Sequence, residues 1–215
     1  MVLKVTRLEL GPFPVNCYVV GAEGGEEAVV VDPGWPGERA RIDAALDGAR
    51  CAAVLITHGD IDHLGGVSEL AGATGAAVYM AREERERLER LDELVDPSWG
   101  IDVRPYEPDV LLRGDETLEL AGIRFETVLV PGHTPAHLAF AAENALFSGD
   151  VLFAGSVGRT DRPGNDWETL LASIRALLER FPPETVVYPG HGPPTTLGRE
   201  AAANPFLAEL RAAPR

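Results

Sequence analysis

A short polar cluster that directly follows an apolar run constrains this chain more than any other feature. Residues 52–56 read Ala-Ala-Val-Leu-Ile, a pattern typical of a buried strand. Residues 57–63 read Thr-His-Gly-Asp-Ile-Asp-His, so that two imidazoles and two carboxylates lie close together along the chain. Carboxylates are rarely buried unless they are paired or bound to an ion. The cluster is therefore either an ordinary solvated loop or a cation site at a strand end, where open α/β sheets collect their chemistry.

Length and composition limit the class of protein. The chain has 215 residues, of which 45% are hydrophobic, and we expect a single domain over residues 1–215. The formal net charge of −15 argues against a nucleic acid or an anionic membrane as a partner. No apolar run approaches the ~18 residues that span a bilayer, and the first residues lack the apolar stretch of a secretory signal. We therefore expect a cytoplasmic protein, with Cys17 and Cys51 as reduced core residues.

Apolar runs separated by Gly and Pro predict strands and helices that occur twice in a similar order. In the first half we expect three strands within residues 2–32, helices over 36–46, 67–73 and 82–95, and strands over 52–56 and 76–80. In the second half we expect strands over 117–120, 123–130, 137–142, 145–147 and 185–188, and helices over 165–178 and after 195. Asn165 and Glu168 resemble a capping box. The charged run 82–95 is interpreted as a solvated helix and is assigned no chemistry.

Three further polar residues also follow predicted strands. His133 comes after residues 128–130, Asp150 after 145–148, and His191 after 186–188, each preceded by glycine. Glycine permits the tight turns that project a side chain from the end of a strand. Four of the five histidines of the chain, His58 and His63 included, therefore occupy strand ends. Imidazoles and carboxylates together are the ligand set of zinc, iron or manganese, so the sequence indicates a metal site.

The motifs taken together resemble the metallo-β-lactamase fold superfamily, and within it the short bacterial glyoxalase II-like thioester hydrolases. The resemblance covers nearly the whole chain. It is carried by residues 31–34 (Val-Asp-Pro-Gly), 57–66, 131–135 (Pro-Gly-His-Thr-Pro), 148–150 (Ser-Gly-Asp) and 189–193 (Pro-Gly-His-Gly-Pro). It implies an α+β fold, an αββα sandwich of two mixed sheets with helices on both outer faces. It also implies a metal-dependent hydrolase acting on a small thioester such as S-D-lactoylglutathione.

The resemblance further implies a ligand set for one or two divalent metal ions (zinc, iron or manganese). In that pattern His58, residue 60 and His133 hold the first ion, whereas Asp62, His63 and His191 hold the second. Asp150 bridges the two ions. A metal-bound hydroxide would act as the nucleophile, since divalent cations lower the pKa of bound water towards ~7. Asp62 would also orient that hydroxide, which gives it a catalytic role.

Asp60 departs from the family pattern, which has a second histidine in the motif His-x-His-x-Asp-His. A carboxylate is a shorter, harder and negatively charged donor. Three outcomes follow: a first site that favours iron or manganese, a weakened first site, or a single metal. The alternatives to a thioesterase are therefore a persulfide dioxygenase-like mononuclear iron oxidoreductase, a lactonase or other hydrolase, and a scaffold with a degenerate first site. A nuclease is disfavoured because the chain has no basic stripe.

Three more residues are assigned supporting functions. Arg159, in a segment that resembles the corresponding loop of the short enzymes, is predicted to bind a substrate carboxylate bidentately; a surface arginine in a turn is the alternative. Asp32 and His137 are predicted to hydrogen-bond metal ligands, or else to be structural. After His191 the chain reads Gly-Pro-Pro and lacks the tyrosine that glyoxalase II has there near glutathione. The expected partner is a small-molecule thioester, and the oligomeric state is open.

Overall fold

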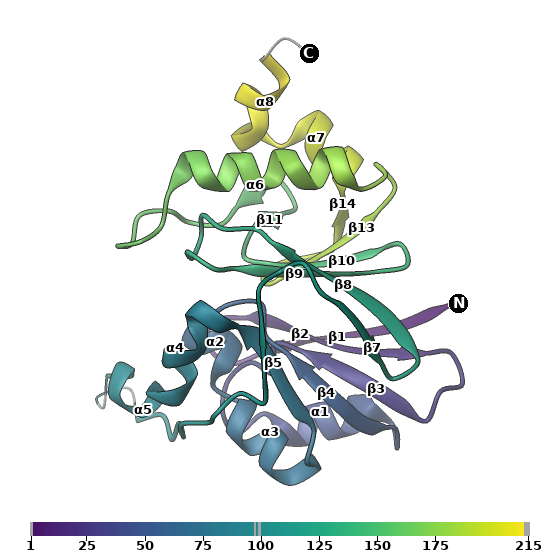
Figure 1. Cartoon of the computed structure of the whole chain (residues 1–215), viewed down its shortest axis with the longest axis vertical. Helices are drawn as coiled ribbons and strands as arrows, with labels where there is room; N and C mark the ends of the chain where they lie inside the picture. Colours follow the sequence, from purple (N-terminus) through teal and green to yellow (C-terminus); the bar gives the residue numbers. More distant parts are fainter. Residues whose placement is uncertain (1, 97, 99, 213–215) are drawn as a thin grey trace.

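Two mixed β-sheets, each of six strands within the described part of the chain, stack face to face (Figure 1). The computed structural model describes residues 2–96, 98 and 100–212. The first sheet has its strands in chain order: β1 (Leu3–Leu10), β2 (Val15–Ala22), β3 (Glu27–Val31), β4 (Arg50–Leu55), β5 (Ala77–Ala81) and β6 (Val110–Leu112). The strands β1, β2 and β3 pair antiparallel, and β3 to β6 pair parallel.

The second sheet has the order β14-β13-β10-β9-β8-β7. Its strands are β7 (Thr117–Leu120), β8 (Ile123–Leu129), β9 (Leu138–Ala142), β10 (Ala145–Gly149), β13 (Val186–Pro189) and β14 (Thr195–Thr196). Among the described strands of this sheet, β10 and β13 are the one parallel pair. A small hairpin, β11 (Leu152–Phe153) with β12 (Ser156–Val157), follows β10.

Helices cover both outer faces (Figure 1). Helices α1 (Arg39–Leu46) and α3 (Val67–Thr74) pack on the first sheet, and α6 (Trp167–Arg180) packs on the second. Other helical segments in the described part of the chain are α2 (Ile61–Leu64), η1 (Arg82–Glu84), α4 (Arg85–Glu89), α5 (Leu91–Leu94), α7 (Leu197–Ala203), η3 (Pro205–Leu207) and α8 (Ala208–Ala212). The predicted αββα sandwich is confirmed. None of the described helices is long and apolar enough to cross a membrane.

Strand residues alternate between two cores, because successive side chains point to opposite faces of a sheet. In β4, Ala53 and Leu55 face the core between the sheets, whereas Val54 faces the helices below. Phe140 and Phe147, both fully buried, fill the inter-sheet core from the other side. Because β4 is buried on both faces, its sequence is a continuous apolar run and does not alternate between apolar and polar residues.

The expected charged helix over residues 82–95 is wrong as a continuous element, since the chain forms η1, α4 and α5 there. The break falls at Arg90, whose φ of −122° and ψ of 29° are not helical. The Leu88 carbonyl accepts the Tyr106 amide from the connection that follows, at 3.2 Å. Two side chains of the segment also turn towards residue 59, as described below. Tertiary hydrogen bonds therefore override the helical propensity of the run.

The start of α6 also differs from the expectation. Its N-cap is Asp166 rather than Asn165, and the Asp166 carboxylate accepts the Thr169 amide at 2.8 Å. The Asp166 amide in turn donates to the Gly132 carbonyl at 2.9 Å. This contact sets the register of the cap and ties the start of α6 to the loop that carries His133.

Candidate metal centre

The strand directions bring the seven predicted ligands to one edge of the sandwich. In the second sheet, β8 and β10 run in the same direction because each is antiparallel to β9, and β13 is parallel to β10. The carboxyl ends of these three strands therefore lead to His133, Asp150 and His191 at the same edge. The first sheet contributes the segment that follows β4, which turns into α2 and carries the other four residues, His58, Asp60, Asp62 and His63.

The seven side chains form three overlapping groups in which the potential ligand atoms all lie within 4.8 Å of one another. The groups are His58 with Asp60 and His133, His58 with His63 and Asp150, and Asp62 with His63 and His191. Asp150 lies between the outer two groups. Its carboxylate oxygens are 3.5 Å from Nε2 of His63, 3.7 Å from Nε2 of His133 and 3.6 Å from Nε2 of His191. The geometry thus brings the donor atoms of two candidate cation positions together around the Asp150 carboxylate.

Each of the four imidazoles has its Nδ1 within hydrogen-bonding distance of a nearby group, which orients the ring. The partners are Thr57 Oγ1 for His58 at 3.0 Å, Asp32 Oδ2 for His63 at 2.8 Å, the Arg159 carbonyl for His133 at 2.9 Å and the Pro14 carbonyl for His191 at 2.6 Å. The buried Nε2 atoms of His58, His63 and His133, and Oδ1 of Asp150, find no hydrogen-bond partner among the described residues. Buried polar atoms are normally paired. Donor atoms left without partners on a shared cavity fit a divalent cation.

Asp32 lies directly beneath the cluster, at the end of β3. It is 2% exposed, and its carboxylate accepts hydrogen bonds from the Thr57 amide at 2.9 Å and from the Thr57 hydroxyl at 2.7 Å. Its Oδ2 also lies 2.8 Å from Nδ1 of His63. A proton on Nδ1 leaves the Nε2 lone pair of His63 facing the cluster. The predicted supporting position of Asp32 is therefore consistent with the geometry.

His137 supports the other side of the cluster. It is fully buried, its ring stacks on that of His58 with centroids 4.6 Å apart, and its Nε2 accepts the Asp150 amide at 3.1 Å. Burial lowers the pKa of His137 to about 3, so the ring stays neutral and can accept this hydrogen bond. Gly149 is required next to it, because an added Cβ would lie 2.6 Å from the His137 ring and from Thr57 Oγ1.

The loop that carries His191 is anchored by β2. The Asn16 side-chain amide donates to the carbonyls of Pro189 and Gly192, each at 2.8 Å, and the Tyr18 hydroxyl donates to the Pro189 carbonyl at 2.6 Å. Asn16 is fully buried. The sequence gives little signal for this function, because an isolated Asn in a strand offers no motif, and its partners are backbone atoms more than 170 residues away.

Charges around the cluster favour its carboxylates in the ionised form. Burial alone would raise the pKa of Asp60, but the nearby charges of His133 and Arg162 lower it below the usual value. Burial likewise opposes ionisation of Asp150, yet the charges of His63, His191 and His133 hold its pKa far below the usual range. Burial lowers the pKa of His58. Burial opposes protonation of the other three imidazoles, but the neighbouring carboxylates outweigh it and raise the pKa of His63, His133 and His191. A cation that binds there would therefore displace protons from these rings.

Two arginines at the cluster were missed by the sequence analysis. Arg87 Nη2 lies 3.2 Å from Asp60 Oδ1, and Arg162 Nη1 lies 2.8 Å from Asp60 Oδ2. Arg87 belongs to the charged run to which no chemistry was assigned. The alternation of acidic and basic residues there satisfies the i,i+4 rule for a solvated helix equally well, so sequence spacing could not single out this arginine.

Arg159 lines the cavity over the cluster, but its guanidinium is paired within the chain. It forms two hydrogen bonds with Asp161, at 2.6 and 2.8 Å, and its side chain is 53% exposed. Its backbone carbonyl is the acceptor for His133. The bidentate geometry shows that this guanidinium can bind a carboxylate, although here the partner belongs to the chain itself.

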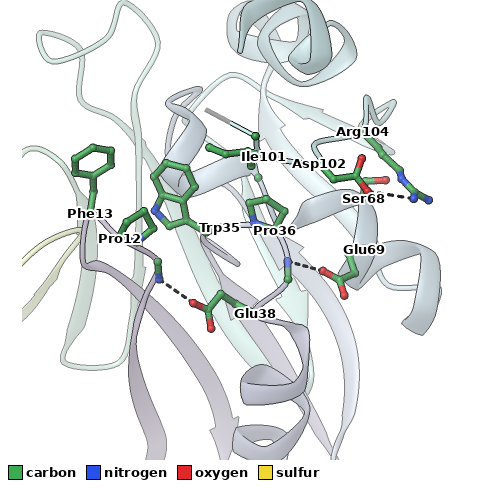
Figure 2. Close-up of a pocket in the computed structure, with 14 residues that line it drawn as sticks. Pro12, Phe13, Trp35, Pro36, Glu38, Ser68, Glu69, Ile101, Asp102 and Arg104 are labelled. Carbon is green, nitrogen blue, oxygen red and sulfur yellow. Dashed lines mark hydrogen bonds and ion pairs between the residues drawn. The ribbon is translucent and has the colours of Figure 1, made fainter. Parts of the chain in front are cut away.

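A cavity of about 740 Å³ opens over the cluster. Phe13, Trp35 and the side chains of α5 form its apolar wall, and Arg87, Arg159 and Arg162 lie on its basic side. A second cavity of about 930 Å³ lies on the other side of Trp35 and contains none of the seven clustered residues (Figure 2). Figure 2 shows Glu38 and Glu69 at its base, where they accept the amides of Gly11 and Gly37 at 3.0 and 2.9 Å. Of these two cavities, the first faces the candidate ligands.

Known proteins resemble this chain over nearly its full length. A family model described as the metallo-beta-lactamase superfamily matches residues 10–191. Hydroxyacylglutathione hydrolase GloC of Haemophilus influenzae is 36% identical over 211 residues, which cover 95% of this chain and 98% of GloC. The crystal structure of the BLEG-1 B3 metallo-beta-lactamase superposes with a TM-score of 0.86 at 36% identity, covering 95% of this chain and 100% of that one. TTHA1623 in a di-iron-bound form superposes with a TM-score of 0.82 at 41% identity, covering 94% and 100%.

Proposed function

Since this chain belongs to the metallo-beta-lactamase superfamily of metal-dependent hydrolases, we propose that it is a thioester hydrolase of the glyoxalase II type. Its substrate class would be small thioesters such as S-D-lactoylglutathione. The superfamily binds one or two metal ions, and we propose two divalent cations for this chain. Their identity, whether zinc, iron or manganese, follows from the donor set only as a class.

One observation carries the proposal: four imidazoles, each with Nδ1 at a hydrogen-bonding partner, turn Nε2 towards three carboxylates. In our assignment His58, Asp60 and His133 would hold one cation, Asp62, His63 and His191 the other, and Asp150 both. Cations bound there would supply Lewis acidity, which polarises a carbonyl oxygen and makes water acidic near neutral pH. The crystal structure of TTHA1623 in a di-iron-bound form, at 41% sequence identity to this chain, supports a pair of ions.

The other residues of the chain would orient this constellation. Asp62 lies 3.2 Å from Nε2 of His191, at the mouth of the cluster, and we assign it the catalytic orientation of water. Asp32 would hold His63 in the ligating tautomer, and His137 would hold the backbone of Asp150. Arg159 would receive a substrate carboxylate by exchanging it for Asp161.

The thioester assignment rests on the relation to GloC, which spans nearly all of both chains. A thiolate leaves readily, so that a strong protein acid is not required at the leaving group. A second candidate is β-lactam hydrolysis, which the relation to the BLEG-1 B3 metallo-beta-lactamase favours. The carboxylate at position 60 departs from the His-x-His-x-Asp-His pattern of the superfamily and favours harder metals than zinc, which argues against an ordinary zinc β-lactamase.

The test is hydrolysis of S-D-lactoylglutathione by metal-free protein reloaded separately with zinc, manganese and iron. We expect turnover within the ~1–10³ s⁻¹ usual for enzymes, with iron or manganese preferred over zinc. Asp62→Ala provides the inactive control, and nitrocefin tests the second candidate. No turnover of the thioester with any metal, despite measured binding, would refute the proposal. Oxygen uptake with a persulfide and one iron per chain would replace it with a dioxygenase.

A further inference from the structure

Asp60 stands where the related motif has a histidine, and a carboxylate is a different kind of ligand. Its side chain is shorter than imidazole and offers two equivalent oxygens that can rotate. In this chain the rotation is defined, because Asp60 Oδ2 lies 3.9 Å from Nε2 of His58 and 3.6 Å from Nε2 of His133. The side chain of Asp60 is only 15% exposed. Something must therefore hold one oxygen of this carboxylate towards the two imidazoles.

Two guanidinium groups do so, one on each carboxylate oxygen. Arg162 donates to Oδ2 at 2.8 Å from the segment after β12, and Arg87 donates to Oδ1 at 3.2 Å from α4. A carboxylate oxygen accepts two hydrogen bonds. The second lone pair of Oδ2 therefore remains for the imidazole side of the cluster. Contacts on both oxygens, from segments far apart along the chain, fix the plane of the carboxylate.

Arg87 is itself held in place by the residue before Asp60. Its Nε donates to the Gly59 carbonyl at 3.0 Å, and Glu84 accepts the Gly59 amide at 2.8 Å. An added Cβ at Gly59 would lie 2.5 Å from Glu84 Oε2 and 2.7 Å from Arg87 Cγ. Glycine at this position therefore lets the η1–α4 segment approach the motif. The pair Gly59-Asp60 and the pair Glu84 and Arg87 fit each other as one unit.

We propose that Arg87 and Arg162 are positioning residues that make Asp60 a working ligand of the first cation in place of imidazole. They aim the carboxylate at the position between His58 and His133, and they offset the negative charge that aspartate has and the histidine of the related motif lacks. The inference rests on the proposed metal sites, and it adds the reason why a carboxylate serves at position 60. Hydrogen-bond partners of metal ligands typically account for 10–100-fold in metal affinity.

The experiment measures metal binding, with no substrate present. Three metal-free proteins are compared: the wild type, the double variant Arg87→Gln/Arg162→Gln and the control variant Arg90→Gln. Each is dialysed against increasing free concentrations of Mn²⁺ or Zn²⁺, and the bound metal is counted by mass spectrometry. Arg90 lies in the same charged run and pairs with Glu86 and Glu93 instead of Asp60. We expect the double variant to lose about 10–100-fold in one of two binding steps and to keep the other. Arg90→Gln should match the wild type in both steps.

Rescue by histidine separates positioning from a general loss of structure. Adding Asp60→His to the double variant should restore the weakened step, because imidazole needs no guanidinium partner. Asp60→His with both arginines intact should bind the first ion about tenfold or more weakly than this triple variant, because two cationic side chains lose their carboxylate. Arg162→Gln alone, at a half-exposed side chain, gives a milder variant with a smaller loss in the same step.

Unchanged or tighter binding of both ions by the double variant would overturn the inference, since the arginines would then not support the ligand. Failure of the Asp60→His rescue in a folded double variant would also overturn it. Wild type that binds two ions and lacks thioesterase activity would contradict the proposed function and leave this inference standing. Wild type that binds no ion would overturn both.

Discussion

Asp32 provides the sharpest test of how the cluster is organised. Its carboxylate accepts the amide and the hydroxyl of Thr57 and faces Nδ1 of His63 at 2.8 Å. Asparagine has nearly the same shape, but only one of its two terminal atoms accepts hydrogen bonds. If the amide oxygen keeps the Thr57 amide, the NH₂ group faces His63 Nδ1. The imidazole must then carry its proton on Nε2, the atom that faces the candidate second cation.

The magnitude of this effect follows from two contributions. The affinity of the second ion should fall about 10–100-fold, as for other partners of metal-bound histidines, which corresponds to about 1.4–2.8 kcal/mol. The metal-free protein should also lose about 1.5–3 kcal/mol of unfolding free energy, because hydrogen bonds to a charged group are replaced.

The assay combines equilibrium dialysis of metal-free Asp32→Asn with thermal unfolding of the same sample. The matched control is Asp166→Asn, which makes the same change at the N-cap of α6, where asparagine caps as well as aspartate does. Nitrogen NMR of the histidine rings should show the proton of His63 on Nε2 in the variant. Two ions bound with unchanged affinity by a folded Asp32→Asn protein would refute the reasoning.

Two further substitutions and one labelling experiment have defined outcomes. Asp62→Ala should abolish thioester turnover and weaken binding of one ion; full turnover in steady-state assays would show that Asp62 has neither function. Gly132→Ala should lower the stability of the fold by about 1–3 kcal/mol, because Gly132 has a φ of +136° and the added Cβ would lie 2.4 Å from Leu170 Cα; an unchanged Tm would contradict this. Cys17 and Cys51 should react with Ellman's reagent at pH 8 only after denaturation, because both thiols are free and buried. Burial raises the pKa of each thiol, for Cys51 to about 11, so that both stay protonated. Fast labelling of the native protein would contradict this prediction.

Features with a local sequence pattern could be predicted. The apolar run 52–56 and the motif after it are contiguous, and the observed sandwich was expected from the family resemblance that this motif and the later ones carry. The convergence of His133, Asp150 and His191 could be inferred because each follows a strand, and carboxyl ends of like-directed strands meet at one edge. The assignment of these residues as metal ligands stays a prediction that metal binding must test.

Features fixed by contacts between distant segments could not be predicted. Arg87 was indistinguishable from its charged neighbours, because only the fold places it against residues 59 and 60. The same holds for Asn16, whose hydrogen-bond partners are the carbonyls of Pro189 and Gly192, near the other end of the sequence. The break of the helix at Arg90 likewise has no signal in the local sequence, because the Leu88 carbonyl accepts a hydrogen bond from the distant Tyr106 amide. Tertiary hydrogen bonds determine all three.

The central claim is that seven side chains at one edge of the sandwich hold a pair of metal ions. The most direct measurement is anomalous X-ray diffraction from crystals of metal-reconstituted protein, collected on both sides of the absorption edge of the metal supplied. The account predicts two anomalous peaks per chain, one among His58, Asp60 and His133 and one among Asp62, His63 and His191, with Asp150 between them. Metal peaks elsewhere, or Asp60 turned away from a single bound ion towards its arginines, would contradict it.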